Sequence, residues 1–276
     1  MRLTIDSRGA RVVAERRPGR GVPLVLVHGS GGGLHSWAPV VGLLPDRYET
    51  WVYARRGFAP SDPRAEATTF ADDVADLQAV IDAAGGRAHV VGMSHGATVG
   101  LHHALARPDA VVTLSLFEPP LFAAGPRLAP ALDEYRAHVD AGRATAAQRV
   151  FAARAAQVPA ELLGPEPADL GARTADEDAL VEAVADLHDL ESMGADDGDL
   201  ARWAGVRAPV LLMEGADTWQ PMPRTMDALA EVLPQVTRVR WEGQTHFAAF
   251  VRPDLVVAAL EEFLPAPSPT TSRVSR

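Results

Sequence analysis

The sequence predicts an α/β fold, with a mostly parallel, twisted sheet that carries helices on both faces and a helical insertion between two strands. Three observations support this prediction. Short apolar runs alternate with longer stretches of helical spacing along most of the chain. Residues 125–203 interrupt the alternation with an alanine-rich helical pattern and no convincing strand. With 276 residues, the chain is long enough for one α/β domain with such an insertion.

Six apolar runs have the composition of buried parallel strands. Most of them are rich in leucine or β-branched residues and are bounded by Gly or Pro. These runs cover residues 24–27, 50–53, 89–93, 111–117, 210–213 and 236–241. Two further short runs, residues 3–6 and 11–15, are expected to form a hairpin at one edge of the sheet.

Apolar residues at helical spacing fill the intervals between these runs. The expected helices cover residues 70–84, 95–107, 223–233 and 253–264. Strands that alternate with helices form parallel sheets covered on both faces. The predicted organisation is an α/β core of residues 1–124 and 204–265, a helical insertion of residues 125–203, and a flexible C-terminal tail of residues 266–276, rich in Pro, Ser and Thr.

The composition excludes several classes of chemistry. The chain has no cysteine, and all 26 basic residues are arginine, so thiolate metal sites, cysteine nucleophiles and lysine Schiff bases are impossible. A net charge of −10 without a basic stripe argues against a nucleic-acid partner. No run approaches the roughly 18 apolar residues of a membrane-spanning helix, and residues 1–20 lack the apolar core of a secretory leader. We therefore expect a soluble protein without a membrane span, in the cytoplasm.

The segment with the most chemical information is Gly-Met-Ser-His-Gly at residues 92–96, where a strand runs directly into a helix. This is a G-x-S-x-G pattern in its strand–turn–helix context. Small neighbours let the strand and the helix approach each other around a serine on a tight turn, and the amides at the helix start favour developing negative charge. We predict that Ser94 is the nucleophile of acyl transfer. In the alternative interpretation, Ser94 only caps the following helix.

A glycine-rich loop at residues 28–33 follows the first buried strand. Acyl transfer needs two N–H donors aimed at the oxygen that becomes anionic. The candidate donors are the backbone amides near Ser30 or Gly31 and the amide of His95. The glycine spacing does not match a dinucleotide-binding loop, no phosphate-loop lysine is present, and no His-Glu-x-x-His pattern occurs. No cofactor and no metal are predicted.

Together these motifs resemble the α/β-hydrolase family, in its serine-nucleophile, esterase- or lipase-like branch. The resemblance covers nearly the whole chain. It rests on His28-Gly29, Arg55-Arg56-Gly57, Ser61-Asp62, the turn at 92–96 and the run at 243–247. It implies a catalytic serine, acid and histidine in that chain order, and a helical lid after the strand at 111–117.

His246 is the predicted catalytic base among nine histidines. It follows the run at residues 236–241 through a short turn, which places it at the carboxyl edge of the sheet near Ser94. By contrast, His102 and His103 lie a helical turn or more beyond the nucleophile.

Two carboxylates compete for the acid position. Asp217 lies near the place where the family most often keeps its acid, but the usual Gly-x-x-Asp spacing, counted from Gly215, falls on Thr218. Glu118 ends the apolar run at 111–117, where a carboxylate is costly unless a cationic or hydrogen-bonding group faces it. We favour Glu118 slightly and keep Asp217 as the alternative.

The sequence therefore predicts a serine hydrolase that cleaves a small-to-medium, largely apolar ester, lactone or thioester through an acyl-enzyme. Its expected partner is a small-molecule acyl substrate, and the oligomeric state is not predicted. The alternative is a non-hydrolytic protein of the same fold, either a biosynthetic cyclase or lyase or a ligand-binding accessory protein.

Overall fold

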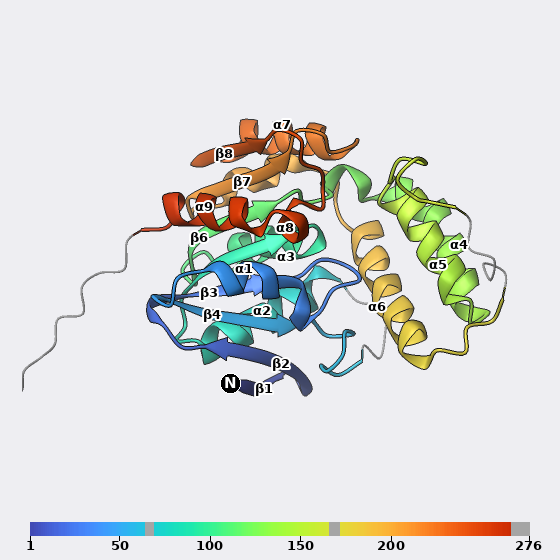
Figure 1. The fold of residues 1–276 in the computed structure, drawn as a ribbon, viewed down its shortest axis with the longest axis horizontal. Coiled ribbons are helices and arrows are strands. Elements are labelled where there is room, and N and C mark those ends of the chain that lie inside the picture. Colours follow the sequence, from blue (N-terminus) through green and yellow to red (C-terminus); the bar gives the residue numbers. More distant parts are fainter. Residues whose placement is uncertain (64–68, 166–171, 266–276) are drawn as a thin grey trace, which may run out of the picture.

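The computed structural model describes residues 1–63, 69–165 and 172–265 of the chain (Figure 1). These residues form one eight-stranded sheet in the order β1-β2-β4-β3-β5-β6-β7-β8. The strands are β1 Arg2–Ser7, β2 Ala10–Arg17, β3 Arg20–Val27, β4 Tyr48–Ala54, β5 Ala88–Met93, β6 Val111–Phe117, β7 Val210–Gly215 and β8 Val236–Trp241. The predicted C-terminal tail, residues 266–276, lies outside the described residues.

In the sheet order, the strands from β4 to β8 run parallel to one another, whereas β1 and β2 form a hairpin whose strand β2 pairs antiparallel with β4. The predicted α/β fold and its N-terminal hairpin are thus confirmed. β3 starts four residues earlier than its apolar run indicates, because its first residues, Arg20–Val22, are exposed and contain a single apolar side chain, that of Val22.

Alternate side chains of the central strands enter two separate cores. In β3, Val25 and Val27 pack into one core, and Leu24 and Leu26 pack into the other. Both faces of the parallel strands are therefore buried, which explains why these strands read as continuous apolar runs.

Helices cover the two faces of the sheet, as Figure 1 shows. On one face lie α2 Phe70–Ala83, α3 His95–Ala106 and α7 Met222–Val232, and on the other lie α1 Ala38–Leu43, α8 Ala248–Val251 and α9 Pro253–Phe263. The four predicted helices are all present. The short helices α1 and α8 were not predicted, because four to six residues are too few for helical spacing to be recognised.

The segment between β6 and β7 is helical, as expected, and contains no strand among its described residues. We call α4 Ala129–Asp140, α5 Ala144–Val150, the π-helical turn Phe151–Ala155 and α6 Glu177–Gly194 the helical insertion. Shorter 3-10 turns are Leu34–Trp37, Leu121–Ala123, Pro126–Leu128 and Leu200–Gly205. In Figure 1 the insertion lies beyond one end of the sheet. The buried Tyr135 hydroxyl donates to the Ala183 carbonyl at 3.0 Å and ties α4 to α6.

Among the described helices, none combines the length and the apolar character needed to cross a membrane.

Candidate active site

Ser94 lies in the tight turn between β5 and α3. Its φ of 51° and ψ of −123° are a strained combination for a residue with a side chain. The turn is held from both sides: the Ser94 amide donates to the Phe117 carbonyl at 2.8 Å, and the Ser94 carbonyl accepts from the Ala97 amide at 2.9 Å. Ser94 lines a cavity at this edge of the sheet.

The two glycines of the turn are required by close packing. A Cβ at position 92 would lie 2.4 Å from the Gly96 carbonyl oxygen, and a Cβ at position 96 would lie 2.4 Å from the Val27 carbonyl oxygen. No other residue allows strand and helix to approach this closely. The observed geometry therefore supplies the physical reason for the G-x-S-x-G pattern.

His246 lies on the loop between β8 and α8 and lines the same cavity as Ser94. Its Nδ1 donates to the Glu118 carboxylate, with 2.6 Å between Nδ1 and Oε2. The ring packs near Trp219 and Phe117, with centroids 5.8 and 5.9 Å away. In a neutral imidazole that donates through Nδ1, Nε2 is an acceptor, the state that a general base requires.

Glu118 directly follows β6, with a φ of 43°, and its side chain is completely buried. Besides His246, two groups donate to its carboxylate: the Gly215 amide to Oε1 at 2.8 Å, and the Thr218 hydroxyl to Oε2 at 2.9 Å. Three donors offset the cost of burying the charge. Thr218 stands where the family spacing expects the acid, and here it supports a carboxylate from the neighbouring strand.

Asp217, the alternative acid, lies one residue before Thr218 on an exposed turn. Its amide donates to the Gln244 carbonyl at 2.8 Å, and within the described residues no hydrogen bond joins its carboxylate to His246. Of the two candidates, Glu118 and not Asp217 is brought to the histidine. Asp217 lies one residue before Thr218, the residue of this turn whose side chain reaches Glu118, and this explains the difference.

The glycine-rich loop, residues 28–33, passes directly beside the serine. A Cβ at position 29 would lie 3.1 Å from the Ser94 Cβ, and both Ser30 and Gly31 line the cavity. The Gly31 amide donates to Asp186 Oδ1 at 2.7 Å, so this amide is already engaged. For the Ser30 amide, no partner occurs in the part of the chain that the structure describes. Of the two backbone amides that the sequence offered as oxyanion donors in this loop, that of Ser30 is therefore the one available to a substrate.

The His95 amide is the second candidate donor. It lies at the first position of α3, where amides have no acceptor within the helix. The His95 ring is buried, and neither of its nitrogens has a hydrogen-bond partner among the described residues. The ring stacks on Phe70, with centroids 5.0 Å apart.

The cavity has a volume of about 290 Å³, at the lower end of the usual range for small-molecule sites. The core and the helical insertion both contribute to it. Its apolar lining consists of Met93, Phe117, Pro120, Phe151, Ala152, Ala155, Ala156, Val158, Leu190, Met193, Trp219, Met222, Phe247 and Phe250. Its described lining contains no arginine, aspartate or glutamate. The indole of Trp219, on the loop after β7, donates at 2.7 Å to the carbonyl of Ala156, the residue that follows the π-helical turn of the insertion.

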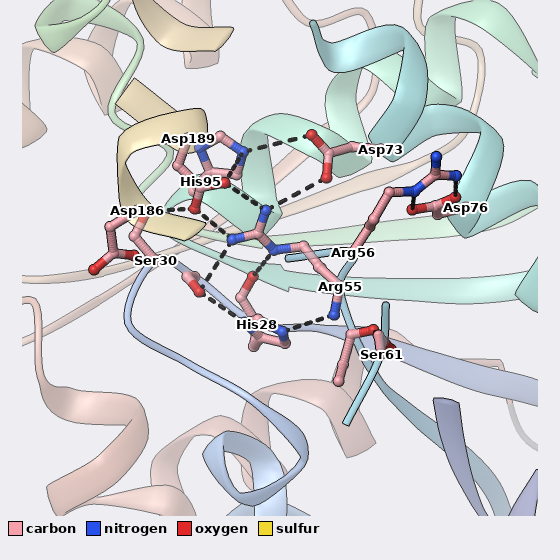
Figure 2. Close-up of polar contacts among 12 residues, drawn as sticks. His28, Ser30, Arg55, Arg56, Ser61, Asp73, Asp76, His95, Asp186 and Asp189 are labelled. Carbon is pink, nitrogen blue, oxygen red and sulfur yellow. Dashed lines mark hydrogen bonds and ion pairs between the residues drawn. The ribbon is translucent and has the colours of Figure 1, made fainter. Parts of the chain in front are cut away.

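A buried ionic cluster behind the loop escaped the sequence analysis (Figure 2). Arg55 is completely buried and donates to Asp189 through Nη1 at 2.9 Å and through Nη2 at 2.5 Å. Burial and the neighbouring Asp189 raise the pKa of Asp186 to about 7, and burial and Arg55 lower the pKa of His28 to about 3. One signal for the two aspartates exists in the sequence, because they interrupt the buried stripe of α6 formed by Ala183, Leu190 and Met193.

Comparisons with known proteins agree with this architecture. A family model described as the alpha/beta hydrolase family matches residues 24–259. A solved structure, an alpha/beta hydrolase from Sphaerobacter thermophilus, is similar with a TM-score of 0.79 and 31% sequence identity, over 95% of this chain and 99% of the other.

Two curated relatives match this chain with a lower sequence identity or over a shorter segment. The 2-(acetamidomethylene)succinate hydrolase of Mesorhizobium japonicum is 27% identical over 267 residues, 91% of each protein. A putative carbamate hydrolase, RutD, of Azorhizobium caulinodans is 33% identical over 99 residues, which are 36% of this chain and 37% of that protein. This chain therefore matches little more than a third of the length of the carbamate hydrolase.

Proposed function

This chain belongs to the alpha/beta hydrolase family, and from this premise we propose that it is a serine hydrolase for an uncharged, largely apolar acyl substrate. Ser94 is the proposed nucleophile, His246 the base and Glu118 the acid. The observation that carries the proposal is the 2.6 Å contact between His246 Nδ1 and Glu118 Oε2, with His246 and Ser94 on the same cavity.

The proposed reaction follows from the roles of these groups. His246 Nε2 takes the proton of Ser94 Oγ as this oxygen attacks the acyl carbonyl, and Glu118 stabilises the imidazolium that forms. The amides of Ser30 and His95 donate to the carbonyl oxygen as it becomes anionic. His246 then protonates the leaving group, and water releases the acyl group from Ser94.

The lining of the cavity supports the substrate class. A buried carboxylate on the substrate would need a cationic partner, and the described lining provides no arginine. By contrast, the relative from Mesorhizobium japonicum is named for a succinate, which is a dicarboxylate, so its name does not indicate the substrate class that this lining favours. We therefore place neutral esters first, followed by lactones, thioesters and amides. The helical insertion is the proposed lid, since the π-helical turn and α6 contribute apolar side chains to the cavity.

The geometry favours the hydrolase over the non-hydrolytic alternative. The sign of that alternative in the sequence is the competition of two carboxylates, Glu118 and Asp217, for the acid position. The hydrogen bond of Glu118 to His246 orients the imidazole as general-base catalysis needs.

The test compares wild type with Ser94→Ala. We expect wild type to hydrolyse p-nitrophenyl valerate and to react with a fluorophosphonate probe, and Ser94→Ala to lose both activities.

The substrate class is tested with the hemiglutarate p-nitrophenyl ester, which has nearly the same size as the valerate but carries a charge. We expect its kcat/KM to be lower than that of the valerate by about 100-fold or more, because its carboxylate would be buried without a partner. Equal labelling of Ser94→Ala would refute the proposed nucleophile, and a preference for the charged ester would refute the proposed substrate class.

A further inference from the structure

Helix α6 of the insertion contacts the glycine-rich loop through two buried aspartates (Figure 2). Asp189 Oδ2 accepts from the Ser30 hydroxyl at 2.8 Å, and Asp186 Oδ1 accepts from the Gly31 amide at 2.7 Å. Both aspartates are almost completely buried. Two consecutive residues of the loop are therefore bound to carboxylates from a helix more than 150 residues away in sequence.

Arg55 completes the contact from the side of the sheet. Its Nε donates to the His28 carbonyl at 3.1 Å, and its Nη2 donates to the Gly29 carbonyl at 3.3 Å. The same guanidinium carries the ion pair with Asp189. Arg55 thus joins the α6 carboxylate to the two peptide groups that precede Ser30.

These contacts determine how the Gly29–Ser30 peptide is oriented. His28 Nδ1 and Arg55 Nη2 both donate to the Gly29 carbonyl, at 2.7 and 3.3 Å. In a trans peptide the N–H points opposite to the C=O, so the Ser30 amide points away from His28 and Arg55. The next amide, that of Gly31, is bound by Asp186. Of the two candidate amides, those of Ser30 and Gly31, the network therefore leaves that of Ser30 available to donate to a substrate.

We propose that Asp186 and Asp189 are positioning residues, through which α6 holds residues 28–33 in the conformation that directs the Ser30 amide toward the reacting carbonyl. This inference rests on the proposed function, since the amide matters only if an oxyanion forms beside Ser94. In this proposal the rate of catalysis depends on how α6 packs against residues 28–33. This role of the insertion is separate from substrate selection by its apolar side chains.

Stability alone is a poor explanation for this cluster. Apolar residues of similar volume would hold a helix against a sheet at least as well as a buried ion pair, because the ions must be desolvated. The cluster gathers Asp73, Asp186 and Asp189 around one arginine, with His95 Nε2 3.5 Å from Asp189 Oδ1 and 3.8 Å from Asp73 Oδ2. What the carboxylates provide, and apolar residues would not, is directional bonds to the loop.

The chain offers a matched control in the neighbouring pair Arg56 and Asp76. Asp76 is also buried, on α2, and accepts from Arg56 Nη2 at 2.5 Å and from Nε at 3.1 Å. None of its described bonds reaches residues 28–33. Asp76→Asn therefore removes the ion pair of a similarly buried aspartate without touching the loop.

The experiment measures hydrolysis and amide hydrogen exchange in Asp186→Asn, Asp189→Asn and Asp76→Asn. In the first two variants, after correction for the active fraction by fluorophosphonate titration, we expect kcat to fall by about 10- to 100-fold with KM within about 3-fold. Binding of a trifluoromethyl ketone, which forms an oxyanion on Ser94, should weaken in proportion to kcat/KM. Exchange at residues 28–33 should accelerate. Asp76→Asn should lower Tm but leave kcat and this exchange unchanged.

A milder variant covers the case in which Asp189→Asn does not fold. Ser30→Ala removes the hydroxyl that donates to Asp189 and leaves the ion pair and the Ser30 amide in place, so we expect a fall in kcat of about 3- to 10-fold and a Tm only a few degrees lower. If Ser94-dependent turnover is present but kcat and loop exchange in these variants match Asp76→Asn, the positioning role is wrong and the proposed function stands. If wild type shows no Ser94-dependent turnover, the proposed function fails and the positioning role fails with it.

Discussion

The carboxylate of Glu118 is saturated with donors, from the Gly215 amide, the Thr218 hydroxyl and His246 Nδ1. In Glu118→Gln the amide group of the new side chain has to face one of these donors, which turns a hydrogen bond into a clash of two N–H groups or leaves His246 in the wrong tautomer. We expect kcat to fall by about 10²- to 10⁴-fold, up to the loss of about 10⁴-fold known for replacing the acid of a serine triad by its amide. Steady-state kinetics with a neutral ester measures the loss.

Asp217→Asn is the control for this change, because Asp217 is exposed and forms no described side-chain bond to His246. Its kcat should stay within about 2-fold of wild type, as for most surface substitutions. A larger loss in Asp217→Asn than in Glu118→Gln would reverse the assignment of the acid.

Residues of the site differ in how far sequence reasoning could reach them. Ser94 and His246 follow from local motifs whose context is readable along the chain. The choice between Glu118 and Asp217 depends on which turn faces the histidine, and that is decided by tertiary structure. Asp186 and Asp189 were missed because their partners, Gly31 and Ser30, lie more than 150 residues away.

At the scale of whole elements, patterns of apolar residues predicted the strands because both faces of the parallel sheet are buried. Their ends were less predictable. The edge strand β8 is only half-buried, yet its bounds match its run, whereas β3 extends beyond its apolar run by pairing Arg20 with Tyr48. Backbone pairing of this kind leaves no trace in side-chain hydropathy.

The end of β7 provides the next prediction. A Cβ at position 215 would lie 2.3 Å from the Gln244 carbonyl oxygen and 2.8 Å from the Thr245 nitrogen, both on the loop that carries His246. Gly215→Ala must therefore push this loop away from β7 and move His246 relative to Glu118. We expect an activity loss of at least about 10-fold together with a destabilisation of about 1–3 kcal/mol. Ester kinetics and thermal unfolding measure the two effects.

Gly42→Ala is the comparison for position 215. Gly42 lies in α1 with no atom within 4 Å of an added Cβ, so the same substitution should be neutral or stabilise by up to about 1 kcal/mol. Full activity of Gly215→Ala would show that the His246 loop does not depend on its close packing against β7.

At the scale of the whole molecule, sheet order brings the site together. Ser94, Glu118, Thr218 and His246 follow β5, β6, β7 and β8, which are consecutive neighbours in the sheet. Because parallel strands end at the same edge, residues from four distant parts of the chain meet there. The alternation of strands and helices in the sequence predicted this convergence, but not the position of the insertion above it, which depends on contacts such as that of Trp219 with Ala156.

The buried histidines determine how the stability of the molecule depends on pH. Burial lowers the pKa of His28 to about 3, and that of His89 and His103 to about 4, from an ordinary value of 6.5. A group whose pKa is lower in the folded protein binds its proton more readily when unfolded, so its stabilising contribution is present above pH 6.5 and is lost as the pH falls toward the folded pKa.

Asp186 acts in the opposite direction, because burial raises its pKa from 3.8 to about 7 and its contribution is lost as the pH rises through 7. The pKa shift of His28 is of similar size and offsets the effect of Asp186 on stability. His89 and His103 therefore decide whether the free energy of unfolding rises or falls as the pH is lowered.

We expect the free energy of unfolding, measured by urea titration, to fall between about pH 7.5 and 5. In His103→Gln this fall should shrink by about 2 kcal/mol, at about 1.4 kcal/mol for each pKa unit. The same change at the exposed His35 should leave the fall intact, and stability that rises toward pH 5 in wild type would contradict the burial of these histidines as neutral groups.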